Sequence, residues 1–255
     1  MAIDLVEMFA AWRARHTRRA WKPVCTRAPG GQFGGAPLLA PGEAWPTCEQ
    51  CDRPLQFFLQ LDLATLPAAF GARGAGTLQL FCCTWDGDCE THLPFSGTHV
   101  VRLLTGPAGP ARHPGGLAPF PARTIQRWDE IIDLPHPEEH GALGLIYDHD
   151  FATYETTVRG EGLVVAGLPI DRTGALPDAA ETIGDAAPGD KLGGWPQWVQ
   201  RVEYPACPTC GHRMELVLQL GSEDNVPYMF GDVGTGHVTQ CPTHPEVLAF
   251  GWAGS

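Results

Sequence analysis

Cys48-Glu-Gln-Cys51 and Cys207-Pro-Thr-Cys210 are two copies of the pattern that decides the fold. In each copy an apolar run follows the cysteine pair and includes a Leu-Gln-Leu triplet, at residues 59–61 and 218–220, and the two copies align without a gap. A glycine-led segment with strand character follows later and ends on further cysteine or histidine residues. The sequence therefore predicts a duplicated β framework that carries two sets of metal ligands.

The predicted cofactor is structural zinc, one or two ions per chain. Zinc binds four nitrogen or sulfur ligands in a tetrahedron, and two cysteines separated by two residues can bind one ion from a tight turn. A redox site would need a thioredoxin-like βαβ setting, which neither copy offers. Disulfides are disfavoured by an odd count of 9 cysteines. The predicted ligands are Cys48, Cys51, Cys83 and Cys89 in the first set, and Cys207, Cys210, Cys241 and His244 in the second.

The first set contains an ambiguity because Cys82 and Cys83 are adjacent. Ungapped counting from Cys51 matches Cys82 to Cys241, whereas alignment of the leading glycines matches Cys83 to it. Side chains alternate between the two faces of a strand, so Leu80 and Cys82 share one face and Cys83 lies on the other. Alternation favours Cys83 as the ligand and Cys82 as a small buried apolar residue, and the alternative assignment stays open.

Composition indicates a globular protein of 255 residues that can bury a substantial core. The 31 glycines and 24 prolines favour short strands and many turns. A formal net charge of -12 argues against a nucleic-acid-binding surface or a membrane partner, and it would suit a basic protein partner. No apolar run reaches membrane-spanning length and the N-terminus lacks a secretory pattern, so we expect a cytoplasmic protein with reduced thiols.

The expected fold class is α+β and β-rich, with an internally duplicated antiparallel β framework, pseudo-twofold halves and an N-terminal helix. Apolar residues at helical spacing predict that helix over residues 3–20, and a loop completes the segment 1–44. The first half is expected at about 45–150 and the second at about 151–255, within a single domain of residues 1–255.

Other segments have weaker patterns. The apolar residues of 124–134 fit helical spacing slightly better than strand alternation, and 171–190 has the composition of a loop. Cys25, which lies outside both ligand sets, is predicted to be a buried or unreactive thiol. Further strands are predicted at residues 99–104, 163–170 and 247–252.

The stretch Lys191-Leu-Gly-Gly-Trp-Pro-Gln-Trp-Val-Gln200 has paired glycines and two tryptophans that flank a proline. It has two interpretations of equal weight. The tryptophans could form an exposed aromatic clamp for a partner, or they could plug a core, because tryptophan is favoured at binding hot spots and is also heavily buried on average. On the first interpretation the partner-binding residues are Trp195, Pro196, Trp198 and Asp232, the last from a glycine-rich turn.

This stretch, together with Met229-Phe-Gly-Asp-Val-Gly234 and Thr239-Gln-Cys-Pro-Thr-His-Pro-Glu-Val-Leu-Ala-Phe250, resembles the bacterial YwqG-like family, over about residues 45 to 252. The resemblance implies a compact, internally duplicated, β-rich fold that is similar in architecture to the eukaryotic programmed-cell-death-2 proteins. Those proteins act as dedicated chaperones for a ribosomal protein, and bacterial members of the family are suspected to be immunity proteins beside toxins. The family implies no established catalytic site.

These observations predict a non-catalytic, zinc-stapled protein-binding module. The most specific version of this prediction is a toxin-neutralising immunity protein, and the related version is a dedicated chaperone. The predicted partner is a protein, a basic toxin or a client, and neither nucleic acid nor membrane.

The alternative is a zinc metallohydrolase built on the stretch His136-Pro-Glu-Glu-His140. This stretch fits the pattern H-x-x-E-H, in which two histidines on one helix face bind zinc and Glu139 would act as the base. Glu215 is the candidate for a third ligand. Against this interpretation, two prolines and Gly141 leave barely one turn of helix, whereas the motif needs a sustained helix to direct both imidazoles.

Overall fold

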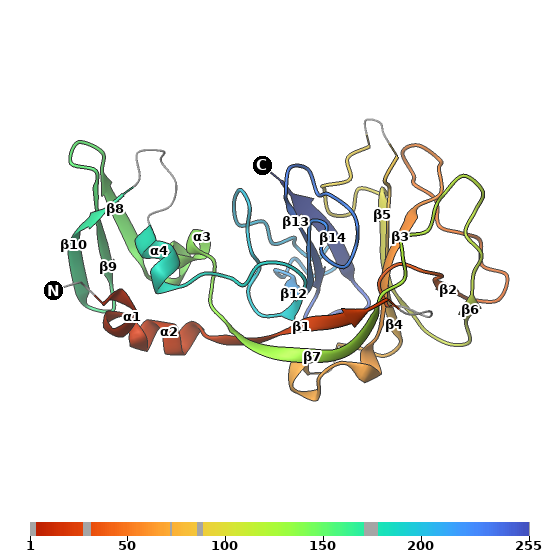
Figure 1. The fold of residues 1–255 in the computed structure, drawn as a ribbon, viewed down its shortest axis with the longest axis horizontal. Coiled ribbons are helices and arrows are strands. Elements are labelled where there is room, and N and C mark those ends of the chain that lie inside the picture. The colour runs from red at the N-terminus through yellow and green to blue at the C-terminus, as the bar shows by residue number, and fades with distance from the viewer. Residues whose placement is uncertain (1–3, 28–31, 72, 86–88, 171–177, 255) are drawn as a thin grey trace.

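The computed structural model describes residues 4–27, 32–71, 73–85, 89–170 and 178–254, which form a β-rich α+β protein (Figure 1). The largest sheet has six strands in the order β14-β13-β12-β11-β1-β7, and all neighbouring strands are antiparallel. Its strands are β1 (Arg18–Thr26), β7 (Thr124–Asp133), β11 (Lys191–Gly193), β12 (Glu215–Gly221), β13 (Thr235–Gln240) and β14 (Leu248–Ala253).

The remaining strands make three smaller antiparallel sheets. A three-stranded sheet contains β3 (Gln56–Asp62), β4 (Thr77–Cys82) and β5 (His99–Leu104) in that order. A second three-stranded sheet has the order β10-β9-β8, with β8 (Ile146–Asp150), β9 (Glu155–Gly160) and β10 (Leu163–Pro169). A two-stranded ribbon pairs β2 (Leu38–Leu39) with β6 (Gly109–Pro110).

The duplication predicted from the cysteine pattern is present in the backbone. Each C-x-x-C turn has the same two hydrogen bonds: the first cysteine N–H donates to the carbonyl five residues later, and the N–H four residues later donates back to that cysteine. A β-bulge follows at equivalent places, between Phe57 and Leu59 and between Leu216 and Leu218. The hairpins β3–β4 and β12–β13 are therefore two copies of one unit, each extended by a third strand, β5 or β14.

The two copies pack against each other across the main hydrophobic core (Figure 1). Strand β5 of the first copy contacts β14 of the second, where the rings of His99 and Phe250 lie 5.5 Å apart. Burial of the single apolar face of each hairpin requires the other hairpin, so neither copy can complete a core alone. Core side chains contributed by the two copies include Phe58, Leu61, Leu78, Leu80, Leu218, Leu220, Val238 and Phe250.

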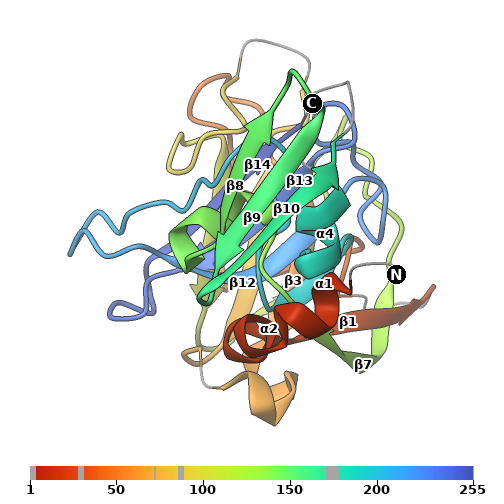
Figure 2. The ribbon, with the colours of Figure 1, turned by 90° about the vertical axis from the view of Figure 1, so that its left-hand side faces the viewer.

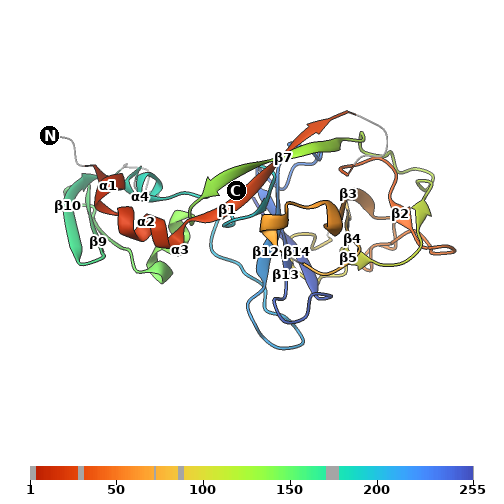
Figure 3. The ribbon, with the colours of Figure 1, turned by 90° about the horizontal axis from the view of Figure 1, so that it is seen from below.

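A second, smaller core lies beside the sheet β8–β10, which packs on short helices (Figure 2). Its helices include α1 (Leu5–Met8), α2 (Ala10–His16) and α4 (Asp178–Ile183), and α3 (Pro137–His140) lies nearby. The long strands β1 and β7 run from this smaller core to the main core (Figure 3). No helix in the described part of the chain is long and apolar enough to cross a membrane.

The structure corrects the predicted extent of the N-terminal helix and decides between strand and helix for residues 124–134, and both findings concern strands β1 and β7. The N-terminal helix ends at His16, and residues 18–26, expected to be helix and then loop, pair with β11 on one side and β7 on the other. Residues 124–133 form strand β7 despite their helical spacing. The two segments pair with each other from Arg18 to Thr26, and this long-range pairing outweighs a weak local periodicity.

Other segments agree with the expectations. Strand β5 has the predicted bounds, β10 covers 163–169 and β14 covers 248–253. The expected loop at 171–190 instead contains helix α4, and its residues 171–177 lie outside the described part of the chain.

Candidate metal centres

The two sets of candidate ligands are assembled from the same parts in both copies. The C-x-x-C turn precedes the first strand of each hairpin, and Cys83 and Cys241 each follow directly after the last residue of the second strand. Antiparallel pairing places the end of the second strand beside the start of the first, which brings the third ligand to the turn. The fourth ligand, Cys89 or His244, comes from the loop that follows.

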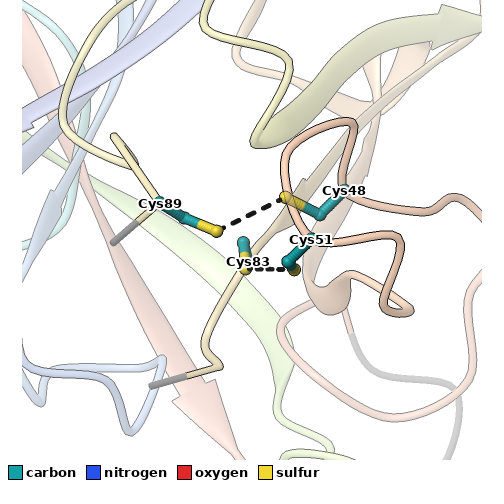
Figure 4. Close-up of side chains that lie close together, drawn as sticks. All are labelled: Cys48, Cys51, Cys83 and Cys89. Carbon is teal, nitrogen blue, oxygen red and sulfur yellow. Dashed lines mark hydrogen bonds between the residues drawn. The ribbon is translucent and has the colours of Figure 1, made fainter. Parts of the chain in front are cut away.

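In the first cluster, the four thiols of Cys48, Cys51, Cys83 and Cys89 converge (Figure 4). The sulfur atoms of Cys48 and Cys89 are 3.9 Å apart, and those of Cys51 and Cys83 are 3.8 Å apart. All four sulfur atoms lie within 4.8 Å of one another. Cys83 and not Cys82 joins the cluster, as strand alternation predicted.

In the second cluster, Cys207, Cys210, Cys241 and His244 converge in the same way. The sulfur atoms of Cys210 and Cys241 are 3.6 Å apart. The Nδ1 atom of His244 lies 3.8 Å from the sulfur of Cys207 and 3.7 Å from that of Cys241. The imidazole therefore takes the place that the thiol of Cys89 has in the first cluster.

These distances fit a tetrahedral metal ion. A zinc–sulfur distance of about 2.3 Å puts two sulfur ligands of a tetrahedron about 3.8 Å apart. A disulfide would need the two sulfur atoms to be about 2.05 Å apart, and every cysteine is free. Both clusters could therefore hold a metal ion with all four positions supplied by the protein.

Backbone N–H groups point at the cluster sulfurs and favour the thiolate form that a metal needs. The sulfur of Cys241 accepts from the backbone N–H groups of Thr243 and His244 at 3.4 and 3.3 Å. Burial alone would raise the pKa of Cys207, but hydrogen bonds from the backbone of Cys210 and Thr209 and from neighbouring thiols lower it to about 6.

The two cysteines outside the clusters have the opposite character. Burial in the main core raises the pKa of the Cys82 thiol well above its ordinary value. Burial, together with the negative charge of Asp190, raises the pKa of Cys25 to about 11. Both therefore stay protonated at neutral pH, as expected for small apolar residues.

The H-x-x-E-H stretch forms the short helix α3, and its side chains are engaged in packing contacts. The carboxylate of the buried Glu139 accepts hydrogen bonds from the indole of Trp198 and the hydroxyl of Tyr204, both at 2.8 Å. Both ring nitrogens of His140 are also hydrogen-bonded, to Tyr147 and to the backbone of Pro135. Within the described residues these groups join no metal-ligand cluster.

The proposed third ligand of that motif lies elsewhere. Glu215 starts strand β12 and pairs with Arg73 at 2.9 Å on the surface. The structure thus does not bring Glu215 into a site with His136 and His140.

Of the two interpretations of residues 195–198, the exposed aromatic clamp does not fit the structure. Trp195 is 3% exposed and Trp198 is 5% exposed, and Pro196 between them is also buried. The indole of Trp195 donates to the carbonyl of His16, so each tryptophan also satisfies its N–H inside the protein. The interpretation as core tryptophans fits this burial; Asp232, by contrast, is exposed.

The sequence did not predict a buried ion pair between Lys191 and Asp133. Lys191 and Asp133 are both fully buried, and the lysine Nζ lies 2.9 Å from the carboxylate. The same carboxylate accepts from the backbone N–H groups of Ala187 and Trp195, each at 2.7 Å. Lys191 was part of the quoted motif, but no local pattern marks Asp133, because its role depends on a strand far away in the sequence.

Comparison with known proteins places the chain in a family. The model of the family described as "Domain of unknown function (DUF1963)" matches residues 31–240, so the chain belongs to this family. A stretch of 34 residues is 53% identical to the uncharacterized protein YpfL of Salmonella typhimurium (strain LT2). That stretch covers 13% of this chain and only 8% of YpfL.

Proposed function

We propose that this member of the DUF1963 family is a non-catalytic protein-binding module whose two hairpins are held by structural zinc, one ion in each cluster. The observation that carries the proposal is the pair of four-ligand clusters at equivalent positions of a duplicated unit. A structural zinc ion at such a site supplies folding free energy, because the ligand set exists only in the folded chain.

The closed character of both clusters supports a role without turnover. Catalytic zinc sites keep one position open for water or substrate, whereas each cluster here offers four protein ligands. The alternative hydrolase loses support because Glu139 would have to act as a base, yet its carboxylate already accepts hydrogen bonds from Trp198 and Tyr204.

The proposed partner is a basic protein, in line with the net charge of -12. One face does not suit such a partner. A groove of about 470 Å³ is lined by four arginines and a single acidic residue. We therefore infer that a basic partner binds away from this groove, whose arginines are Arg18, Arg19, Arg73 and Arg213.

The finer roles follow from the resemblance to the YwqG-like family. A toxin-neutralising immunity protein and a dedicated chaperone both bind one protein client, and both use a rigid scaffold without chemistry of its own. The two roles differ in the client: an immunity protein abolishes the activity of a toxin, whereas a chaperone releases a functional protein.

The test starts from the zinc-loaded protein as bait in a lysate of its own source organism. We expect one basic protein to be retained, with an affinity that falls as salt rises, because exposed charges are screened. Arg213→Glu is a matched control on the excluded face and should not weaken the complex. Hydrolysis of a peptide library that disappears in Glu139→Gln, with the zinc content unchanged, would overturn the proposal in favour of an enzyme.

A further inference from the structure

A cavity of about 610 Å³ lies along β13 and β14, and none of the eight cluster residues lines it. This volume falls within the range of small-molecule pockets, roughly 300–1,000 Å³. Aromatic side chains form much of the wall. The residues that matter for recognition are Trp198, Tyr204, Trp252, His237 and Thr239.

Two buried polar atoms in the cavity lining have no hydrogen-bond partner within the described part of the chain: Nε2 of His237 and Oγ1 of Thr239. His237 is 8% exposed and Thr239 is 2% exposed. They are two residues apart on β13, so both side chains lie on the same face of the strand. Because buried polar groups are nearly always hydrogen-bonded, two orphans side by side in a cavity point to a ligand.

The equivalent positions of the first copy show what satisfies such groups when the face is covered. Gln79 and Phe81 occupy them on β4. The Gln79 amide donates to the carbonyl of Leu38 at 2.7 Å and accepts from Arg102 at 3.1 Å. Phe81 packs on Phe57, with ring centroids 5.1 Å apart. The first copy therefore fills this face with its own chain, and the second leaves it lined by two unsatisfied groups.

The protonation state of His237 defines what the cavity accepts. Burial lowers the pKa of His237 to about 3, against the effect of a hydrogen bond to the backbone of Gln197, so the ring is neutral at physiological pH. A neutral imidazole has one N–H donor and one acceptor nitrogen, and we assign the acceptor role to the unpartnered Nε2. Nε2 is then an acceptor and requires a donor from the ligand.

The rest of the cavity lining adds shape and little polarity. The ring centroids of Trp198 and Tyr204 are 4.9 Å apart. The indole N–H of Trp198 and the hydroxyl of Tyr204 both already donate to Glu139. Arg201 and Glu203 pair with each other at 2.7 Å, so they leave no unbalanced charge in the lining. An uncharged ligand with a flat apolar ring matches these walls.

We propose that this cavity binds an uncharged aromatic ligand whose N–H or O–H group donates to Nε2 of His237, with Thr239 as a second hydrogen-bonding group. The site is independent of the proposed protein partner. Its lining comes from β13, β14 and the segment 198–205, together with residues 92–94 of the first copy.

Indole and 1-methylindole are the probes, since they differ only in the N–H donor. By isothermal titration, indole should bind saturably and 1-methylindole about five- to tenfold more weakly, the expected loss for one hydrogen bond. His237→Phe should lower the affinity for indole to that for 1-methylindole and leave the latter unchanged. Equal affinities of the two probes for the wild-type protein, or no binding of either, would overturn the proposal.

A spectroscopic measurement tests the same contact without a mutation. In the imidazole ¹⁵N spectrum of the wild-type protein, indole should shift the Nε2 resonance of His237, and 1-methylindole should not. An Nε2 resonance that shifts with neither probe would contradict the proposed contact, even if indole binds elsewhere.

A pair of buried threonines tests whether the hydroxyl of Thr239 lacks a partner. Thr239→Val should melt at the same temperature as the wild type or higher, because it removes an unsatisfied group. Thr98→Val is the matched control and should melt lower, since the Thr98 hydroxyl lies 2.7 Å from that of Ser96. A Thr239→Val loss as large as that of the control would show that the fold itself satisfies this hydroxyl, and would overturn the proposal.

Discussion

The two C-x-x-C turns have the same backbone hydrogen bonds but very different surroundings. The first cluster lies in an apolar cluster rich in aromatic side chains, which includes Leu39, Leu55, Phe57, Phe81, Trp45 and Trp85. The second cluster contacts little apolar surface beyond Met214, Ala249 and Val247. Apolar burial therefore supports the first turn independently of any metal, whereas the second turn has few contacts besides its ligands.

The two copies therefore share the geometry of their candidate ligands but differ in how much apolar packing surrounds them. We expect the first site to keep much of its local structure without a metal, because each buried aromatic side chain contributes to the packing around it. The second site is expected to depend on its metal for local order. The same outer face of the second copy is also where the His237–Thr239 cavity lies.

The largest expected effect comes from removing one ligand in each copy. Cys51→Ser and Cys210→Ser change equivalent, half-buried cysteines, and each should cost the protein one zinc ion. Structural zinc contributes on the order of 10 kcal/mol in small zinc domains, so both variants should be destabilised, Cys210→Ser more severely. Zinc content and urea unfolding of both variants measure this. Equal losses of stability would refute the asymmetry between the two copies.

The sheets of the two copies also end differently, and a buried ion pair marks the difference. The sheet of the second copy continues from β12 through β11 into β1 and β7. Within this extension, Lys191 of β11 forms an ion pair with Asp133 of β7. Lys191→Met would leave Asp133 buried without its counter-charge, and we expect a loss of about 3–5 kcal/mol in urea unfolding. Glu215→Gln, which removes the exposed pair with Arg73, is the control and should cost less than about 1 kcal/mol.

An effect of similar size is expected from the apolar support of the first site. Phe81→Ala removes a fully buried ring and should cost about 3–5 kcal/mol, while the first cluster keeps its zinc. Thr239→Ala changes the equivalent residue of the second copy and should cost less than about 1 kcal/mol. If Phe81→Ala released the zinc without a loss of stability, the packing around the first site would have no supporting role.

The smallest effect concerns one backbone position after each turn. Asp52 and Gly211 are equivalent, and both have positive φ, 58° and 74°. A residue with a Cβ atom is strained there, so Gly211→Ala should cost about 1 kcal/mol and Asp52→Gly should be neutral or slightly stabilising. Thermal unfolding of both variants checks the signs. A stabilising Gly211→Ala, or a clearly destabilising Asp52→Gly, would mean that the two turns are not equivalent.

Spacing was enough to predict the duplicated hairpins and the residues of the two candidate metal clusters, because the same short pattern occurs twice in the sequence. Strand alternation also selected Cys83 over Cys82. Strand β1 was missed, and residues 124–134 were left open between strand and helix, because the pairing of β1 with β7 joins residues about a hundred positions apart and no local period reports it. The burial of Trp195 and Trp198 was equally hidden, since it depends on the distant Glu139 and His16.

Metal content and coordination of the untagged protein test the central claim most directly. Elemental analysis should find two zinc ions per chain, and X-ray absorption should find zinc–sulfur distances of about 2.3 Å with nitrogen as a minor ligand. The minor nitrogen follows from the ligands, seven cysteines and one histidine over two sites. Stable, folded protein that contains no metal, or zinc bound mainly by oxygen and nitrogen, would contradict the account.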